Sequence, residues 1–284
     1  DSLRAVADAA GKERAQFLGS AYAKGAKAYE ENPQAKLEIE NLNQRIFAQD
    51  KTIKELYQKG RKWSLEYFET IYKRLGTKFD YYYFESEVGK IGIALVQKGL
   101  GKGIFEKSQG AVIFPGEKYG LHSRVFINSL GLPTYEAKEL GLAPTKYKDF
   151  KYDLSVIITG NEIIDYFKVL LAALQQLEPS LAAKTRHLSH GMVRLPEGKM
   201  SSRTGNVITG ESLLDGVKAR VFKIMESSGT DLSAKEKENA AEIISLGAVK
   251  YSLLRVGLGK DIIFDFEKSL NLEGESGPYL QYTY

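Results

Sequence analysis

Residues 154–160 read LSVIITG, a continuous apolar and β-branched run that decides the fold. Such a run is typical of a strand that is buried on both faces of a parallel sheet. It leads through Gly160 into a helical pattern over 162–177, and a second strand is predicted over 185–193. Strand, helix and strand in this order predict the crossover unit of an open α/β sheet, in which ligands bind beyond the carboxyl ends of the strands.

The segment directly after the second predicted strand is therefore the first place to look for chemistry. Residues 195–206 read LPEGKMSSRTGN, which sets the cations Lys199 and Arg203 beside the hydroxyls of Ser201 and Ser202. Cations and short donors in a glycine-flanked loop suit contact with phosphates. Taken alone, the same window also fits a solvated charged loop.

Four segments are predicted along the chain. Helical periodicity runs to Gly76, which is a typical helix stop, and short β-rich runs follow with a helical segment among them. The β-rich runs are 81–84, 110–114 and 124–128. The predicted segments are a helical part over 1–76, a mixed α/β insertion over 77–150, the α/β core with its loop over 151–209, and a helical region over 210–284.

Composition narrows the class of protein. The chain has 284 residues, of which 43% are hydrophobic and 27% charged, so that a disordered or fibrous protein is excluded. It has no cysteine, which excludes disulfides and cysteine-ligated zinc, and no apolar run is long enough to cross a bilayer. A formal charge of +4 permits binding to a polyanion without demanding it. We expect a cytoplasmic location.

The loop resembles a family signature. Lys199-Met200-Ser201-Ser202-Arg203 is similar to the KMSKS motif of class I aminoacyl-tRNA synthetases, and it stands after a strand as it does in that family. The resemblance implies a Rossmann-like (HUP-type) parallel-sheet catalytic core with a mixed insertion and C-terminal helices. It also implies ATP as a substrate, together with Mg²⁺, and catalytic roles for Lys199, Ser201, Ser202 and Arg203 at the triphosphate.

Three further stretches resemble arginyl-tRNA synthetases within that class. Residues 189–193 resemble the strand that contacts adenosine, which implies ATP binding by His190, Gly191, Met192 and Val193, with Lys199. Residues 277–282 resemble the passage into the helical anticodon-binding domain. Residues 131–140 resemble the arginine-pocket helix, and this implies arginine, ATP and tRNA(Arg) as partners.

The resemblance to the pocket helix implies that Tyr135 and Glu139 face arginine. Residues four apart share one helical face, and a carboxylate can hold a guanidinium through paired hydrogen bonds. A surface contact between residues four apart on an exposed helix is the alternative. The family usually has aspartate at the position of Glu139.

A second departure lies in residues 160–167, where relatives commonly have a glutamine near Ile163. Isoleucine cannot donate that hydrogen bond. Either the alignment is shifted by one residue, or Asn161, Glu162 or Asp165 supplies the polar contact, and we name Glu162 as an arginine-binding candidate. A helix N-terminus rich in caps and acids explains the same residues.

The three histidines do not predict a metal site. His187 and His190 lie three residues apart on a predicted strand, so their side chains point to opposite faces. Their spacing matches that of the HIGH motif of these synthetases. The residues between them differ from that motif, and the pair lies beside the loop that carries Lys199, so we reject the identification. His122 is predicted to be an ordinary surface or packing residue.

Three functions are compared on this basis. The first is an arginine-tRNA ligase, which activates arginine with ATP and transfers it to tRNA(Arg). The second is a catalytically silent module of the same fold that binds nucleotide or tRNA, and the third is a related nucleotidyltransferase. Because no HIGH motif is found and the chain stops at Tyr284, we expect a fragment without the HIGH region and the anticodon-binding domain, inactive by itself.

Overall fold

The computed structural model describes residues 11–196, 209–229, 231–271 and 274–284. Contacts divide the chain into two compact units, one formed by Asp1–Lys78 with Gly191–Tyr284 and the other by Phe79–His190. We call them the outer unit and the inner unit, after their places in the sequence. The four segments predicted from the sequence are not tested by this division and stay a prediction.

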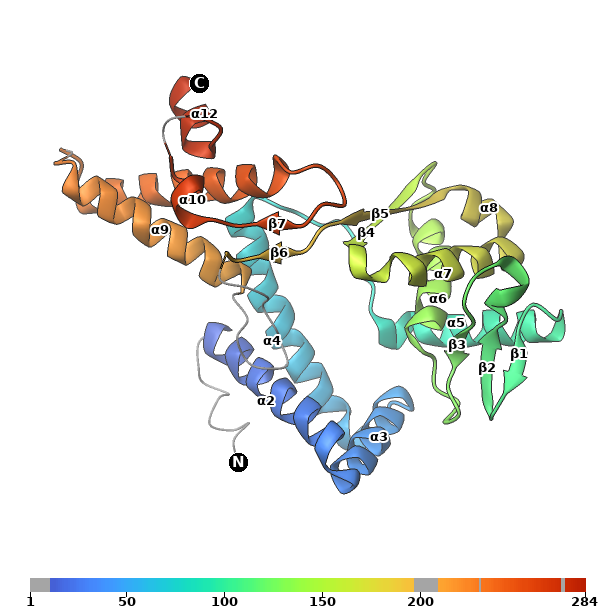
Figure 1. The fold of residues 1–284 in the computed structure, drawn as a ribbon. Helices are drawn as coiled ribbons and strands as arrows, with labels where there is room; N and C mark the ends of the chain where they lie inside the picture. Colours follow the sequence, from blue (N-terminus) through green and yellow to red (C-terminus); the bar gives the residue numbers. More distant parts are fainter. Residues whose placement is uncertain (1–10, 197–208, 230, 272–273) are drawn as a thin grey trace. The chain divides into compact units, whose positions relative to one another are not determined.

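The inner unit combines helices with two small sheets (Figure 1). Its elements in chain order are α5 (Glu85–Gly101), β1 (Glu106–Ser108), β2 (Ala111–Phe114), η1 (Gly116–Tyr119), β3 (Arg124–Ile127), α6 (Tyr135–Asp149), β4 (Ser155–Gly160), η2 (Asn161–Ile163), α7 (Ile164–Leu177), α8 (Pro179–Ala183) and β5 (Thr185–His190). Strands β1, β2 and β3 form an antiparallel sheet. The predicted strands over 110–114 and 124–128 are thus confirmed.

Strands β4 and β5 form the predicted parallel pair. Their register runs from Ser155 opposite Thr185 to Gly160 opposite His190, and α7 makes the crossover between them. The strand–helix–strand unit is therefore confirmed. Both strands end at the same edge, directly before η2 on one side and Gly191 on the other.

The expectation that β4 is buried on both faces is wrong for this chain. Ile157 packs against the inner core, but Ile158 is 64% exposed and Val156 is 47% exposed. Side chains alternate along a strand, so one face meets the core and the other faces outward. The long apolar run reflects a face that no described element of the chain covers.

Glycines bring α5 and α6 together at backbone distance. A Cβ added to Gly92 would lie 1.8 Å from the carbonyl oxygen of Ala137, and one added to Gly141 would lie 2.2 Å from that of Val88. Only glycine permits so close an approach. The contact fixes the position of α6, which carries the predicted pocket pair.

The outer unit is built mainly of helices. Its elements are α2 (Gly11–Glu31), α3 (Pro33–Phe47), α4 (Lys51–Leu75), β6 (Val193–Arg194), α9 (Gly210–Ser227), α10 (Ala234–Leu254), β7 (Ile262–Ile263), α11 (Phe266–Ser269) and α12 (Gly277–Thr283). Helix α4 ends at Gly76, whose φ of 68° supplies the left-handed cap, as predicted. A core around Val217, Ala248 and Phe264 joins α9, α10 and β7.

Two sequence predictions about strands are corrected. The strand predicted over 185–193 is two strands, because β5 ends at His190 and Val193 pairs instead with Ile262 of β7. The run over 81–84 is no strand, since it is an extended segment before α5 in which Tyr81 and Tyr82 are exposed. Aromatic and β-branched composition alone misled the prediction there, because no neighbouring strand pairs with the segment.

No helix in the described part of the chain combines the length and the apolar character needed to span a membrane.

Candidate functional site

Helix α6 carries the predicted pocket pair. Thr134 stands at its N-cap in an extended conformation and donates its hydroxyl to the carbonyl oxygens of Val125 and Phe126, which ties the start of the helix to β3. Tyr135 and Glu139 then lie one turn apart, so they share a face of the helix. Their predicted proximity is therefore compatible with the structure, and their contact with arginine stays a prediction.

The face of α6 that carries the pair is turned toward α7. The ring of Tyr135 lies 5.3 Å from that of Tyr166, and Glu139 lines a small cavity together with Lys146 and Ile157. Burial raises the pKa of Glu139 and lowers that of Lys146, since each charge loses hydration. The site therefore holds an acid and a cation in a poorly hydrated setting beside the first half of β4, where Lys146 donates to Ser155 Oγ at 3.0 Å.

A second acid on α6 is already paired. The buried carboxylate of Glu136 accepts a hydrogen bond from Arg124 Nε at 2.6 Å. The Arg124 guanidinium also lies 5.1 Å from the centre of the Tyr166 ring. Arg124 thus neutralises Glu136 and covers Tyr166, which makes this pair part of the framework that joins β3, α6 and α7.

The residues at the start of α7 include the candidates for the polar contact near Ile163. Glu162 is exposed, and Ile163 packs against the inner core, so Ile163 does not provide a polar contact. Asp165 is exposed and bonded to Lys168 at 2.7 Å, a contact that lowers its pKa. The structure does not bring Glu162 into contact with Tyr135 or Glu139 among the contacts it describes, and its role stays a prediction.

The two histidines of β5 point to opposite faces, as predicted. His187 stacks on Phe167 at 4.0 Å between ring centres and lies 2.7 Å from Thr159 Oγ1, whereas His190 is exposed. Burial lowers the pKa of His187. His122 is exposed and contacts Arg124 at 3.0 Å, which fits the surface alternative of the prediction that it is an ordinary surface or packing residue. Among the described residues, no group of three or more histidine or acidic side chains could hold a metal ion.

The stretch predicted to contact adenosine continues in the outer unit. A Cβ on Gly191 would lie 1.9 Å from the carbonyl oxygen of Lys260, so two backbone segments touch there. Met192 N–H donates to Asp261 Oδ1 at 2.9 Å, and Val193 pairs with Ile262. These contacts tie residues 191–193 to residues 260–262.

The predicted catalytic residues Lys199, Ser201, Ser202 and Arg203 lie outside the described residues. The segment that follows them is described from Thr209, which caps α9 by accepting a hydrogen bond from Ser212 N.

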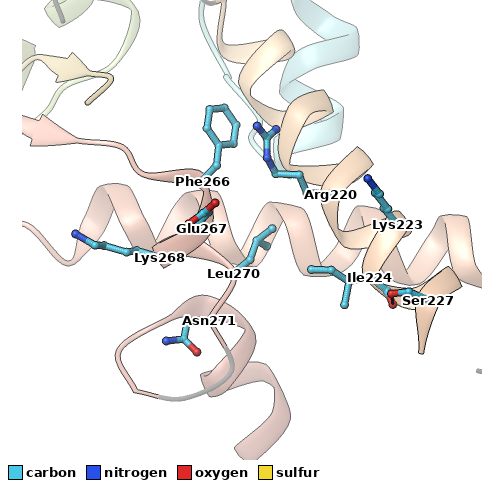
Figure 2. A pocket seen from close by; sticks show the side chains of 9 residues that line it. All are labelled: Arg220, Lys223, Ile224, Ser227, Phe266, Glu267, Lys268, Leu270 and Asn271. Atoms are coloured by element: carbon cyan, nitrogen blue, oxygen red, sulfur yellow. Dashed lines mark hydrogen bonds between the residues drawn. The ribbon is translucent and has the colours of Figure 1, made fainter. Parts of the chain in front are cut away.

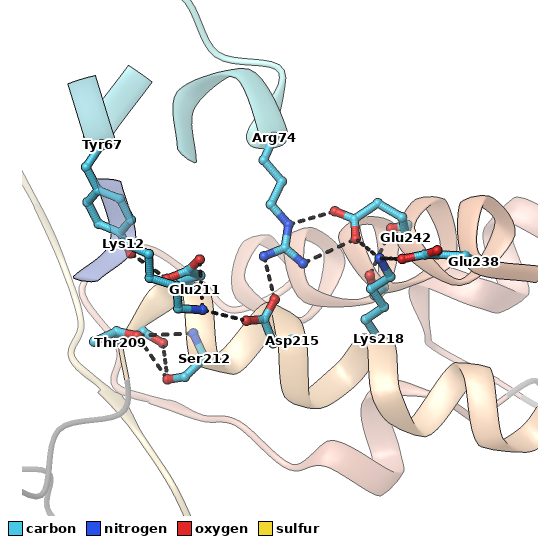
Figure 3. Close-up of polar contacts among 11 residues, drawn as sticks. Lys12, Tyr67, Arg74, Thr209, Glu211, Ser212, Asp215, Lys218, Glu238 and Glu242 are labelled. Atoms are coloured by element: carbon cyan, nitrogen blue, oxygen red, sulfur yellow. Dashed lines mark hydrogen bonds and ion pairs between the residues drawn. The ribbon is translucent and has the colours of Figure 1, made fainter. Parts of the chain in front are cut away.

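An ionic cluster fixes the beginning of α9 (Figure 3). Arg74 of α4 donates to Asp215 at 2.7 Å and to both oxygens of Glu242 at 2.7 and 3.2 Å. Lys12 pairs with Glu211 at 3.2 Å, and Tyr67 also donates to Glu211. Sequence patterns do not reveal this cluster, because Arg74 and its partners are far apart in the chain.

A basic groove lies between α9 and α11, also in the outer unit (Figure 2). It encloses about 700 Å³, and Arg220, Lys223 and Lys268 contribute cations to its lining, with Glu267 as the acid. The Arg220 guanidinium lies 4.1 Å from the centre of the Phe266 ring. Arg220, which stacks on Phe266, and Lys223 thus line the same groove, and both are side-chain types that bind nucleic acids.

Solved structures resemble the fold of this chain. The arginyl-tRNA synthetase of Thermus thermophilus aligns with a TM-score of 0.72 at 24% identity, over 96% of this chain and 51% of that one. The Plasmodium falciparum enzyme aligns with a TM-score of 0.71 at 18% identity, over 93% and 43% of the two chains. At these identities the likeness shows the fold, and the family match over residues 4–266 shows the class, that of the class I tRNA synthetases.

Sequence comparison specifies the family. Residues 4–266 match the family described as tRNA synthetases class I (R), catalytic domain, and the chain belongs to that family. The arginine–tRNA ligase of Treponema denticola is 36% identical over 94% of this chain and 46% of its own length. That of Flavobacterium psychrophilum is 38% identical over 81% and 39%. The chain spans about half the length of the curated relatives it matches.

Proposed function

We propose that this chain carries the arginine-activating part of an arginine–tRNA ligase, which uses ATP to form arginyl-adenylate and then charges tRNA(Arg). One observation supports it above the others. Of the two inward acids of α6, Glu136 is paired with Arg124, whereas Glu139 makes no ion pair among the described residues. A half-buried carboxylate with a raised pKa gains most from a cationic ligand such as a guanidinium.

The proposed reaction joins the arginine carboxylate to the α-phosphorus of ATP. One carboxylate oxygen attacks phosphorus, the bond to the bridging oxygen of pyrophosphate breaks, and pyrophosphate leaves with the electron pair. In this proposal Lys199 and Arg203 meet the charge that grows on the leaving oxygens, and Ser201 and Ser202 donate hydrogen bonds to them. Mg²⁺ arrives with the triphosphate of the substrate.

The nucleotide contacts are proposed for residues 190–193. The backbone contact of Gly191 with Lys260 and the Met192 hydrogen bond to Asp261 support this assignment, because they hold the peptide groups of the stretch in place. Preorganised peptide groups bind a base or ribose without a further ordering cost. His190, exposed at the end of β5, is proposed as a neighbour of the adenosine. We also propose a cytoplasmic location, where charged tRNA is used.

The proposal is tested by arginine-dependent exchange of pyrophosphate into ATP in the natural protein that carries this chain, with tRNA(Arg) present. Exchange with arginine but not with lysine at equal concentration is expected, since the planar guanidinium fits a carboxylate in two hydrogen bonds and the ammonium does not. Binding of ATP without exchange would instead identify the catalytically silent module. Exchange with another amino acid would reject the arginine assignment.

The groove between α9 and α11 is proposed to contact the phosphates of tRNA. Lys223 and Arg220 supply cations on one face of α9, whereas the Lys268 side chain of α11 points away from them and pairs with Asp265 at 3.7 Å (Figure 2). Lys223→Glu should weaken tRNA affinity and reduce its dependence on salt by about one phosphate contact. Lys24→Glu makes the same charge change on an exposed face of α2, and we expect it to leave the salt slope unchanged. Equal effects of the two variants would show only a general charge effect.

A further inference from the structure

The hydroxyl of Tyr166 is a buried polar group for which the described chain offers no hydrogen-bond partner. The residue is 6% exposed, and its oxygen is fully covered. A hydroxyl buried without a partner costs about 1–3 kcal/mol, so most buried hydroxyls in proteins are paired. Such an exception needs an explanation, and a ligand that completes the hydrogen bond is one.

The surroundings of Tyr166 identify the side of the unit on which this group lies. Its ring is 5.3 Å from the ring of Tyr135 and is covered on another side by Arg124, at 5.1 Å. Tyr135 shares a face of α6 with Glu139, so this carboxylate lies on the side of α6 that meets Tyr166. The pKa of the Tyr166 hydroxyl is raised by burial and next by the charge of this carboxylate. They are not hydrogen-bonded to each other in the described structure.

We propose that the Tyr166 hydroxyl is a third polar group of the amino-acid pocket and binds the guanidinium of arginine together with Glu139. This inference rests on the proposed function. A guanidinium has five N–H donors, and one carboxylate accepts two of them in the paired geometry. The phenol oxygen accepts a further N–H while its own proton points to Glu139. The ligand thereby satisfies the two groups at once.

The position of Tyr166 in the helix fits this role. It lies three residues after Ile163, the N-cap of α7, and Ile163 itself is apolar and packed against the core. The contact that Asn161, Glu162 or Asp165 was expected to supply is thus assigned to a buried residue one turn later. Glu162 and Asp165 are exposed, and Asp165 is already bonded to Lys168.

The test compares two buried tyrosines that flank α6. Tyr166→Phe removes a hydroxyl without a partner, whereas Tyr152→Phe removes one that donates to the carbonyl oxygen of Ala143 at 3.3 Å. In the natural protein that carries this chain, we expect Tyr166→Phe to raise the KM for arginine about tenfold, with kcat within twofold, because a hydrogen bond to a charged group is lost. Its melting temperature should stay equal or rise. Tyr152→Phe should lower the melting temperature and leave the KM unchanged.

The outcomes separate this inference from the proposed function. An unchanged KM for arginine in Tyr166→Phe, with normal exchange by the unmodified protein, overturns the assignment of Tyr166 alone. A lower melting temperature with an unchanged KM also overturns it, because the hydroxyl then has a structural partner. If the unmodified protein shows no arginine-dependent exchange, the proposed function fails first, and arginine titration by calorimetry on both forms then decides whether Tyr166 binds the amino acid.

Discussion

Arg74→Met tests whether the ionic cluster holds α4 against α9 and α10. The guanidinium makes hydrogen bonds of 2.7 and 3.2 Å to Glu242 and of 2.7 Å to Asp215, and its side chain is 19% exposed. Removing one partner of a fully buried pair costs about 3–5 kcal/mol, and an exposed pair is worth about 0–1 kcal/mol. Because Lys218 and Lys12 remain close to the two acids, we expect a loss of about 2 kcal/mol in the free energy of unfolding.

The chain offers a built-in reporter for this measurement. Trp63 is its single tryptophan, and it is buried in α4 of the outer unit, so its fluorescence follows the unfolding of that unit. Urea titrations of the unmodified chain and of the variant give the difference in free energy. Lys62→Met is the matched control, because its pair with Glu66 spans 3.7 Å between highly exposed side chains. We expect that control to change stability by less than about 0.5 kcal/mol.

The dependence of folding stability on pH provides a second test of the same ionic cluster. The hydrogen bond from Arg74 is the main cause that lowers the pKa of Glu242. For Asp215 burial is the largest single effect and raises the pKa, but the contacts with Arg74 and Lys12 together outweigh it, so the pKa is lowered. A lowered folded-state pKa gives stability that is present above the unfolded pKa and is lost as pH falls through the folded one. The unmodified chain should therefore lose more stability than Arg74→Met below about pH 4.5. Equal stability of the two chains at pH 7, or parallel acid curves, would refute the reasoning.

Three further changes test the inner unit and the loop. Gly92→Ala places a Cβ against the Ala137 carbonyl, and we expect it to lower the free energy of unfolding by about 3 kcal/mol, measured by thermal unfolding. Gly101→Ala is the control, because the space around Gly101 is open, and we expect no measurable change in stability. Glu139→Gln should weaken arginine binding by about 2–4 kcal/mol in calorimetry, and unchanged binding contradicts the pocket assignment. Lys199→Ala should lower kcat for arginine activation about 100-fold or more while the KM for ATP changes little; a change confined to that KM contradicts a role in the transition state.

Local patterns predicted the parallel pair because it depends on residues close in sequence, whereas the helix that carries Tyr135 and Glu139 was expected from the family resemblance. The β-branched run over 154–160 is enough to specify β4, and the four-residue step from Tyr135 to Glu139 is enough to put both on one helical face. The end of β5 could not be predicted in this way. Residues 191–193 continue the apolar pattern, and only their contact with residues 260–262, distant in sequence, diverts them into another sheet.

The pairing of charges was hidden for the same reason. Arg74 reaches acids more than a hundred residues away, at Asp215 and Glu242, and no local spacing connects them. The unpartnered hydroxyl of Tyr166 is also a property of packing, because the sequence shows a tyrosine but not which atoms surround it. Its place three residues after Ile163 is the one signal in the sequence, and the polar residues Asn161, Glu162 and Asp165 around that isoleucine fit the same role by their chemistry.

The close contact of α5 with α6 connects the packing of the inner unit to its chemistry. Gly92 and Gly141 set the backbone separation of the two helices, so the face of α6 that bears Glu139 is turned toward α7 by contacts on the other side of the helix. A larger residue at Gly92 must push α6 away from α5, and this moves Tyr135 and Glu139 against Tyr166. In the proposed pocket, Tyr135, Glu139 and Tyr166 must all meet one planar guanidinium, so we expect it to tolerate little displacement. Loss of arginine affinity is therefore expected from a change at Gly92, which belongs to α5 and not to the pocket helices.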